Sequence, residues 1–443
     1  MDDTDFDVAI IGSGPAGLWA ADELITNKPG LKVAIFEKRS ASSGGMINDC
    51  KLILSPYVGM DLKELNMEEG EALKYIKTID DKFLEYGADH FVHGTDEKEV
   101  KKLMDRARRC GAQLIPTQQR HIGTDNAGHI VKKYKSDLEA KTVKFFTRTN
   151  ISDIQKHDDY FRLCSDTSKY NAKFVICAPG RNGAYWFRDL ATRLGIEYKW
   201  NPIDVGVRLE VMKEVFDPVT DVIYDPKFIF YTKCHNDRVR TFCTNPSGFV
   251  REEPYEGFSL LNGHALKNKK SNNTNFALLS TMNLTQPYAD TTEMGRSIAS
   301  ETNRLGGGLP IVQRMGDFIA GNRSRLETFY DKSKGYDQIE PTMIPGSQVV
   351  PGDICYAYRA RTVDNLREVF NTLNMIAPGI TDPATLIYAP EIKFYDTKYP
   401  TSKDLETNVP GFYVAGDGAG KSRGIVGAAM TGIIAAKGIL DKI

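Results

Sequence analysis

The stretch Phe6-Asp-Val-Ala-Ile-Ile-Gly12-Ser13-Gly14-Pro15-Ala16-Gly17 decides the fold of this chain. Residues 6–11 are a short run rich in β-branched side chains, and residues 15–26 place apolar side chains at helical spacing. Residues 32–37 form a second short apolar run. This order predicts a strand, a helix and a second, parallel strand, which is the βαβ unit of an α/β protein.

The pattern G-x-G-x-x-G in this stretch predicts a dinucleotide site. Gly12 permits a tight turn, Gly14 lets the backbone approach a pyrophosphate, and Gly17 lets the helix pack on the strand. The helix N-terminus offers N–H groups to phosphate, and Glu37 stands at the end of the second strand, where it can accept ribose hydroxyls. The alternative is a glycine-rich turn without a ligand. The pattern alone does not separate FAD from NAD.

A second glycine segment lies near the other end of the chain. Residues 411–415 read as a strand, Gly416-Asp417-Gly418 follows, and residues 425–440 are apolar and rich in Gly and Ala. This last run contains Lys437 and is shorter than the roughly 20 residues that cross a bilayer. We therefore expect a buried helix.

With these segments the sequence resembles the glutathione-reductase-type FAD superfamily. In that superfamily a C-terminal segment completes the flavin site, and Asp417 matches the aspartate that binds the ribityl chain or the pyrophosphate. Val175-Ile-Cys-Ala-Pro-Gly180 resembles an internal motif of the superfamily, with Pro179 in place of Thr. Asn150-Ile151 matches a hairpin whose backbone faces adenine. The resemblance implies FAD as the cofactor.

Within the superfamily the chain is most similar to bacterial proteins known only as uncharacterised FAD-dependent dehydrogenases. The segments that suggest this are 120–125 (RHIGTD), 204–210 (DVGVRLE), 240–246 (RTFCTNP), 262–264 (NGH), 306–310 (GGGLP) and 418–424 (GAGKSRG). The resemblance covers nearly the whole chain. It implies a fold and a flavin but no substrate.

The motif and the resemblance together name the expected FAD contacts. They are Gly12, Ser13, Gly14, Pro15, Ala16, Gly17, Glu37, Lys38, Gly45, Met46, Ile151, Ala178, Gly180, Arg181, Gly416, Asp417, Arg423, Gly424 and Ile425. No metal ligand set is predicted, because Cys234-His235 has no other Cys or His at metal-binding spacing.

The predicted fold class is α/β, with a discontinuous Rossmann-like FAD-binding domain and a mixed α+β substrate domain. Residues 143–180 contain short strands (VKFFTRTN, YFRLCSD and KFVICAPG) that predict a β-meander beside the parallel sheet. The expected order is FAD-binding segments 1–59, 143–190 and 390–443, a helical excursion at 60–142, and the substrate domain at 191–389.

Composition narrows the class of protein. The chain has 443 residues, of which 41% are hydrophobic and 26% charged, as in an ordinary globular protein. A formal net charge of −1 gives no basic excess for binding nucleic acid. The acidic start MDDTDFDVAI does not resemble a secretory signal, so a cytoplasmic location is expected. Seven scattered Cys without a CxxC pair fit no disulfide framework.

Three residues are predicted to be catalytic: His121, Lys421 and Arg423. His121 lies in a polar, glycine-bearing stretch where an imidazole can exchange a proton opposite a flavin, and a structural role is the alternative. Lys421 and Arg423 precede the last helix, whose N–H groups can stabilise negative charge on the reduced flavin. The alternative for both is a solvated basic side chain in a loop.

Other residues have weaker functional interpretations. Arg208 within an apolar strand needs a partner, and a carboxylate of the protein is favoured over one of a ligand. Cys243 is more readily explained as a small core residue than as a redox thiol. His264 and Gln313-Arg314 can line a ligand pocket, but turn formation and helix capping explain their segments equally well.

No second G-x-G-x-x-G stands between a strand and a helix, so no resident nicotinamide is predicted. The electron partner is then a small-molecule substrate, a transiently bound NAD(P)H, or a redox protein. The first hypothesis is an oxidoreductase that moves a hydride between flavin N5 and a small or medium organic substrate. The alternatives are a flavin monooxygenase, and a binding or assembly protein in which FAD is structural.

Overall fold

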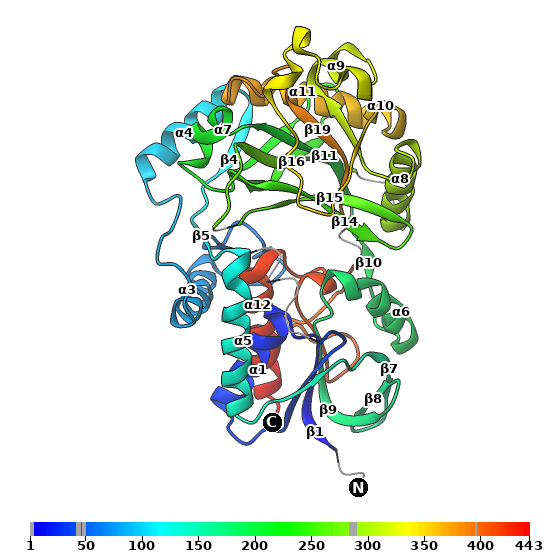
Figure 1. Cartoon of the computed structure of the whole chain (residues 1–443). Coiled ribbons are helices and arrows are strands. Elements are labelled where there is room, and N and C mark those ends of the chain that lie inside the picture. Colours follow the sequence, from blue (N-terminus) through cyan, green and yellow to red (C-terminus); the bar gives the residue numbers. More distant parts are fainter. Residues whose placement is uncertain (1–3, 41–45, 47–49, 267, 283–289, 395–396) are drawn as a thin grey trace. The chain divides into compact units, whose positions relative to one another are not determined.

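The computed structural model describes residues 4–40, 46, 50–266, 268–282, 290–394 and 397–443. The chain forms two compact units (Figure 1). Unit 1 comprises Met1–Phe91, Arg120–Asn201 and Tyr395–Ile443, and unit 2 comprises Val92–Gln119 and Pro202–Phe394.

The predicted segment boundaries differ from these units at three places. Residues 92–119 of the expected excursion belong to unit 2, because β4 (Ala112–Ile115) pairs with a strand of that unit. The expected boundary at 190/191 cuts α6 (Ala184–Leu194), which lies wholly in unit 1. The boundary at 389/390 cuts β19 (Leu386–Lys393), a central strand of unit 2. The functional roles given to the segments stay predictions.

Unit 1 is built on a parallel sheet. Its strand order is β6 (Lys144–Thr147), β2 (Val33–Glu37), β1 (Phe6–Ile11) and β9 (Lys169–Cys177), and β21 (Phe412–Val414) also pairs with β9. All of these neighbours run parallel. With α1 (Pro15–Asn27) between β1 and β2, the predicted βαβ unit and the Rossmann-like architecture are confirmed.

A β-meander is attached to this sheet through the long strand β9. Residues 169–172 of β9 pair with the antiparallel strand β8 (Phe161–Ser165), which pairs in turn with β7 (Ile151–Lys156). The predicted assignment of VKFFTRTN to the meander is wrong. This strand, β6, pairs with β2, and there Phe146 stacks on Phe36 with 4.9 Å between the ring centroids.

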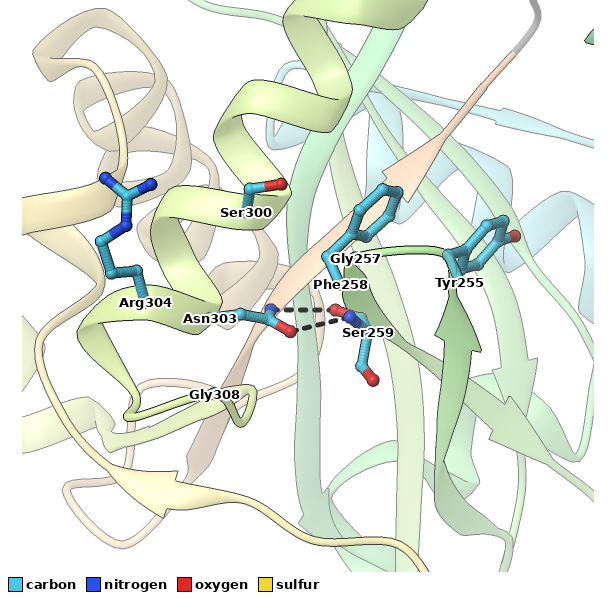
Figure 2. Close-up of a pocket in the computed structure, with 8 residues that line it drawn as sticks. All are labelled: Tyr255, Gly257, Phe258, Ser259, Ser300, Asn303, Arg304 and Gly308. Carbon is cyan, nitrogen blue, oxygen red and sulfur yellow. Dashed lines mark hydrogen bonds between the residues drawn. The ribbon is translucent and has the colours of Figure 1, made fainter.

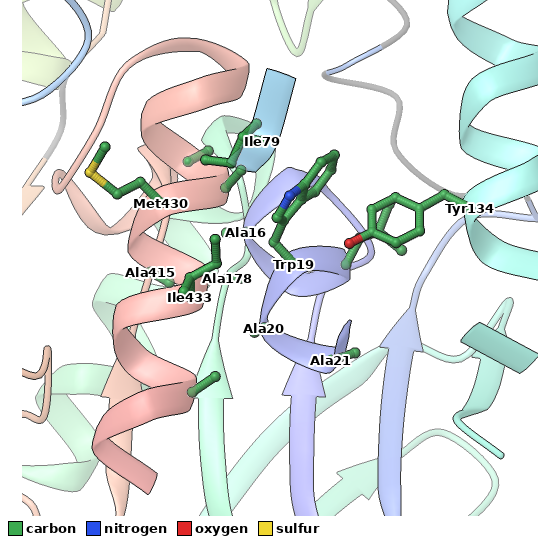
Figure 3. Close-up of a cluster of buried hydrophobic side chains, with 14 of the residues drawn as sticks. Ala16, Trp19, Ala20, Ala21, Ile79, Tyr134, Ala178, Ala415, Met430 and Ile433 are labelled. Carbon is green, nitrogen blue, oxygen red and sulfur yellow. The ribbon is translucent and has the colours of Figure 1, made fainter. Parts of the chain in front are cut away.

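Helices cover both faces of the unit 1 sheet. On one face, α1, α5 (Thr124–Ala140) and α12 (Gly424–Leu440) enclose an apolar core in which Trp19 of α1 meets Tyr134 of α5 edge to face at 4.6 Å (Figure 3). On the other face, α6 packs Phe187 into a second core. The expected buried helix is α12, which is apolar on all sides because almost every residue of it is buried. Among the described residues, none of the helices has the length and apolar character needed to cross a membrane.

Unit 2 is built on a mixed sheet. Its eight strands, in spatial order, are β18 (Val350–Pro351), β17 (Ile311–Arg314), β19, β11 (Ile203–Met212), β16 (Asn273–Met282), β13 (Arg238–Asn245), β12 (Lys227–Tyr231) and β4. All neighbours are antiparallel except β17 and β18. The helices α8 (Thr291–Leu305) and α11 (Ala360–Ile376) belong to unit 2 as well.

The two faces of the unit 2 sheet have different chemistry. Along β11, Val205, Val207 and Leu209 point into an apolar core, whereas Arg208 and Glu210 lie on the opposite face. Segments that surround the sheet include α4 (Glu97–Arg109), α7 (Lys213–Thr220), α9 (Met315–Ala320), α10 (Ile354–Ala357) and the hairpin of β14 (Phe249–Tyr255) and β15 (Phe258–His264). Among the described residues, the other α-helices and strands are α3 (Glu69–Glu85), β3 (Lys51–Ile53), β5 (Gln119–His121), β10 (Lys199–Trp200) and β20 (Thr397–Lys398).

Candidate cofactor site at the carboxyl edge of the parallel sheet

Three distant segments of the chain meet where β1, β9 and β21 end. The first residue after each strand is tied to a neighbouring strand by a backbone hydrogen bond, from Gly12 to Phe36 at 2.8 Å, from Ala178 to Ile11 at 2.9 Å and from Ala415 to Cys177 at 3.0 Å. The chain continues from β1 to β2 and β6 on one side, and later places β9 and β21 on the other side. The loops therefore leave the sheet at a topological switch point, where open α/β sheets bind ligands.

The glycines after β1 have the geometry that the motif predicts. Gly12 has φ of +101°, and a Cβ there would lie 2.2 Å from the carbonyl oxygen of Ala178. A Cβ on Gly17 would lie 2.0 Å from the carbonyl oxygen of Gly12, so α1 packs closely on the turn. Gly14 is different, because no atom lies within 4 Å of its Cβ position. The backbone is thus open at the one glycine that a pyrophosphate would approach.

The carboxylate of Glu37 is held against this glycine loop. Its Oε2 accepts hydrogen bonds from the Ser13 backbone N–H at 3.2 Å and from the Ser13 hydroxyl at 2.7 Å, while Oε1 accepts the Arg39 N–H at 2.9 Å. These bonds orient a half-buried acid beside the start of α1. Glu37 stays the predicted acceptor for ribose hydroxyls.

The loop after β21 is folded around Asp417. One carboxylate oxygen of Asp417 accepts the Ser422 hydroxyl at 2.8 Å, and the other accepts the Gly424 N–H at 3.2 Å. The second bond caps the first turn of α12, so one of the N–H groups expected to stabilise a flavin charge already has an acceptor. A Cβ on Gly418 would lie 2.2 Å from the Gly180 carbonyl oxygen, so this loop packs on the loop after β9.

Lys421 is a buried cation. Its Nζ lies 3.1 Å from Glu64 Oε1, and Lys398 reaches the other oxygen of Glu64 at 2.7 Å. Burial lowers the pKa of Lys421, against the pull of Glu64. The solvated alternative for Lys421 is therefore wrong. Arg423 is fixed through its backbone, because its N–H donates to the Gly59 carbonyl at 2.7 Å. Catalytic roles for both residues stay predictions.

His121 has a partner that the sequence does not signal. Its Nε2 lies 3.4 Å from the Sγ of Cys50, 71 residues earlier in the chain. Cys50 is buried, has φ of +47° and accepts the Ile122 N–H at 2.9 Å through its carbonyl. His121 is half-buried. Its neighbour Arg120 forms a two-bond ion pair with Asp80.

The other expected contacts are distributed around the same edge. Met46, Ile151, Ala178 and Ile425 have buried side chains, whereas those of Lys38 and Arg181 are exposed. Gly45 lies outside the described residues. Contacts of these residues with FAD stay predictions.

In unit 2, other parts of the protein supply hydrogen-bond partners for Arg208 and for Gln313-Arg314. Arg208 is fully buried and binds both oxygens of Glu391 at 2.9 Å, so the favoured protein partner is confirmed. Both side chains of Gln313-Arg314 are fully buried, and their role in lining a ligand pocket stays a prediction. Arg314 donates to the carbonyls of three other residues, and Gln313 bonds the backbone at two positions.

The remaining candidates of unit 2 are His264, Cys243 and His235. Burial, with help from Arg251, lowers the pKa of His264. Cys243 is partly exposed with φ of +49°. His235 Nε2 lies 3.4 Å from Asp364. In the part of the chain that the structure describes, no group of three or more His, Cys, Asp or Glu is arranged to hold a metal ion.

A shallow pocket of about 380 Å³ in unit 2 was not expected from the sequence (Figure 2). It lies between α8 and the tip of the β14–β15 hairpin. On one side, the amide of Asn303 bonds both the N–H and the carbonyl of Ser259, at 2.7 and 3.0 Å. These bonds join the hairpin to the helix, so the polar groups at this point serve the fold.

Comparison with known proteins finds a family match in the N-terminal part of unit 1. A model of the Thi4 family matches residues 1–72. The thiamine thiazole synthase of Methanosarcina acetivorans is 32% identical over 115 residues, which are 26% of this chain and 39% of that protein. The chain thus matches about two fifths of the length of these relatives.

Two more distant likenesses extend over the whole chain. An uncharacterized protein of Clostridium beijerinckii is 22% identical over 469 aligned positions, covering 98% of this chain and 80% of that one. The crystal structure of glycine oxidase from Geobacillus kaustophilus has a TM-score of 0.44 and 14% identity, covering 99% of this chain and 95% of that one. Such values support no conclusion about activity. The resemblance to the bacterial FAD-dependent dehydrogenases stays a prediction, and the family match lies in the segment of residues 1–72 that contains the predicted dinucleotide motif.

Proposed function

We propose that this protein is an FAD-dependent oxidoreductase that holds the cofactor in unit 1. The observation that carries the proposal is the convergence of the loops after β1, β9 and β21 at one edge of the parallel sheet. A single glycine loop serves any dinucleotide. The loop after β21, with Asp417 beside the start of α12, adds the part that the resemblance assigns to a flavin.

The residues at this edge fit a dinucleotide. Gly14 directly precedes α1 and gives the helix no side-chain cap, and the first turn of the helix carries no acid. Its N–H groups and the helix dipole therefore favour a phosphate at the open backbone of Gly14. Glu37 would hold the ribose, and the loop of residues 416–424 would hold the flavin half through Asp417.

Bound FAD would supply hydride acceptance and donation at flavin N5. The chain's own contribution is positive charge and rigidity near that group. Lys421 is held in a buried position by Glu64, and the N-terminus of α12 follows two residues later. Both would favour negative charge on a group bound beside residues 416–424. His121, paired with Cys50, is the proposed group for proton transfer. The substrate is a small or medium organic molecule, and NAD(P)H or a redox protein is the electron partner of the other half-reaction.

The variant Gly14→Ala tests the cofactor site. Because the Cβ position of Gly14 is empty and its φ of −73° suits alanine, we expect the fold to tolerate the change. The methyl group occupies the space of the pyrophosphate, so FAD affinity should fall at least tenfold. Gly70→Ala on α3, whose Cβ position is also empty, is the matched control and should bind FAD as the wild type does.

FAD content is measured by visible absorbance and by titration of flavin fluorescence, and the fold by circular dichroism. Equal FAD affinity in Gly14→Ala and Gly70→Ala would rule out this site. Oxidoreductase activity is tested by anaerobic reduction followed by rapid mixing with organic acceptors. If dioxygen always reoxidises the flavin fastest, hydride transfer to an organic substrate is excluded. Product oxygen derived from dioxygen would instead support a monooxygenase, and a flavin that no reductant converts reversibly would support a structural cofactor.

A further inference from the structure

Three cations surround one aromatic ring on the polar face of the unit 2 sheet. The charged groups of Lys227 on β12, Arg240 on β13 and Lys393 on β19 lie 5.2, 4.7 and 5.5 Å from the ring centroid of Phe242. The ring itself is half-buried. We call Lys227, Arg240, Phe242 and Lys393 the cationic cluster.

Each cation of the cluster forms an ion pair with a buried carboxylate. The pairs are Lys227 with Asp225 at 2.7 Å, Arg240 with Asp204 at 2.8 Å and Lys393 with Glu391 at 2.8 Å. Arg208 is a fourth cation, because it shares Glu391. These ion pairs gather several cations in a region of low exposure.

The two lysines of the cluster have donors to spare. An ammonium group carries three N–H donors. Within the described ranges, Lys393 Nζ has a single acceptor, on Glu391, and Lys227 Nζ has a single acceptor, on Asp225. Their side chains are only 8% and 11% exposed, so bulk water reaches them poorly. Nearly buried donors of this kind require a partner, and the protein leaves these available.

The backbone beside Phe242 is irregular. β13 has a bulge between Phe242 and Asn245, and Cys243 within it has φ of +49°. The carbonyl of Cys243 accepts hydrogen bonds from Arg208 at 3.2 Å and from Asn245 at 2.7 Å, which hold the bulge in place. Bulges and strained residues occur preferentially where a strand aims a side chain at a ligand.

Three segments that the sequence analysis singled out meet at this network. Arg208 of DVGVRLE bonds the Cys243 carbonyl of RTFCTNP and approaches Asn262 of NGH at 3.4 Å. A Cβ on Gly263 would lie 2.5 Å from Arg208 Nη1 and 1.9 Å from Asn245 Nδ2, so only glycine fits there. The three segments therefore build one support beneath the cationic cluster.

We propose that the cationic cluster binds the carboxylate of an organic acid whose apolar body packs on Phe242. The spare ammonium N–H groups of Lys227 and Lys393 are suitable donors to a carboxylate. Aromatic surface adds dispersion and apolar burial for the rest of the molecule. Naming this acid as the substrate rests on the proposed function, whereas the binding itself does not.

The test is calorimetric binding to the full-length protein as purified, with its FAD content recorded by absorbance. Benzoate and hexanoate are the probes, and benzamide and hexanamide are their neutral matches. We expect both carboxylates to bind at least tenfold more tightly than their amides. Lys393→Met should weaken carboxylate binding at least tenfold without changing amide binding. Glu391 keeps Arg208 in this variant, so no buried acid is left unpaired.

Three further variants keep the test decisive. Lys213→Met removes a lysine that is also paired with a carboxylate, Asp217 at 2.6 Å, but lies on α7, and it should bind as the wild type does. If Lys393→Met does not fold, two other variants replace it. Lys393→Arg should retain carboxylate binding within about threefold. Phe242→Leu should weaken benzoate binding at least fivefold and leave acetate binding unchanged.

Three results would overturn the inference. They are equal affinity for acids and amides, a Kd above about 1 mM for both acids, and unchanged binding in Lys393→Met or Phe242→Leu. A protein that binds benzoate but holds no flavin would keep the inference and reject the proposed function. A flavoprotein that binds neither acid would do the reverse.

Discussion

At the scale of single residues, Glu210 shows how unit 2 keeps a carboxyl group away from water. It accepts hydrogen bonds from the Thr342 N–H at 3.2 Å, from Asn273 at 3.0 Å and from the hydroxyls of Thr342 and Tyr388. Among the described residues no ion pair to Glu210 is found. Burial raises the pKa of Glu210 above its ordinary value of 4.5, although these hydrogen bonds oppose the shift.

This shift predicts a pH dependence of stability. Because the folded pKa lies above the unfolded one, the contribution of Glu210 is fully present below pH 4.5 and is lost as pH rises through the folded pKa. Glu210→Gln cannot ionise, so relative to the wild type its free energy of unfolding should increase as pH rises from 4.5 to 7. Urea unfolding at several pH values measures this difference.

The control is Glu97→Gln, at an exposed position in the first turn of α4. Its free energy of unfolding should follow that of the wild type over this pH range. Parallel curves for Glu210→Gln and the wild type would show that Glu210 does not titrate between these limits.

At the same scale, the sequence predicted the environment of single side chains better than it predicted which residues they contact. The buried state of Arg208 and its carboxylate partner follow from a charge inside an apolar strand. The pairing of Lys421 with Glu64, 357 positions apart, follows from no local pattern. Cys50 beside His121 is a similar case, because nothing in either segment points to the other.

At the scale of elements, α1 and α12 pack closely over the parallel sheet because one of them carries a glycine at the crossing. A Cβ on Gly432 would lie 2.0 Å from the Ala16 carbonyl oxygen, at the start of α1. Gly432→Ala should therefore force the helices apart and lower the free energy of unfolding by about 1–3 kcal/mol. Because Ala16 lies in the glycine loop, FAD affinity should fall as well.

The matched control is Gly128→Ala in α5, whose Cβ position has no atom within 4 Å. There the better helix propensity of alanine should raise the free energy of unfolding by about 0.5–1 kcal/mol. Chemical denaturation measures both variants. Equal stabilities would show that the crossing relaxes at no cost.

The same scale shows why strand β6 was assigned to the wrong partner. Its sequence predicts a strand, but a strand pattern does not say which neighbour it pairs with. Phe146 finds Phe36 of β2 across the sheet, and this aromatic contact has no counterpart in the local sequence. In contrast, the helical character of α4 follows from its charge and apolar spacing, which are local properties.

At the scale of the whole molecule, tryptophan fluorescence distinguishes one unit from the other. All three tryptophans, Trp19, Trp186 and Trp200, belong to unit 1. Tryptophan fluorescence therefore reports the unfolding of the unit that is proposed to bind FAD. Added FAD should raise the unfolding free energy monitored in this way, by about 2.7 kcal/mol at a free concentration of 100 Kd.

Denaturant titrations with and without FAD measure this increase. Gly14→Ala should show a much smaller increase at the same FAD concentration, since its affinity is reduced. If FAD leaves the wild-type midpoint unchanged, the cofactor does not bind the folded form of unit 1.

The sequence by itself determined the βαβ unit, the glycine loop, the buried last helix and the presence of a second, mixed α+β region. These follow from short-range rules, since glycine conformation, side-chain periodicity and apolar runs act within a few residues. Only the tertiary structure decided that residues 92–119 join unit 2, that β6 joins the parallel sheet, that Glu64 holds Lys421, and that three cations gather around Phe242. Each of these depends on contacts between segments far apart in the chain, whose free energy comes from packing and charge pairing that no local pattern contains.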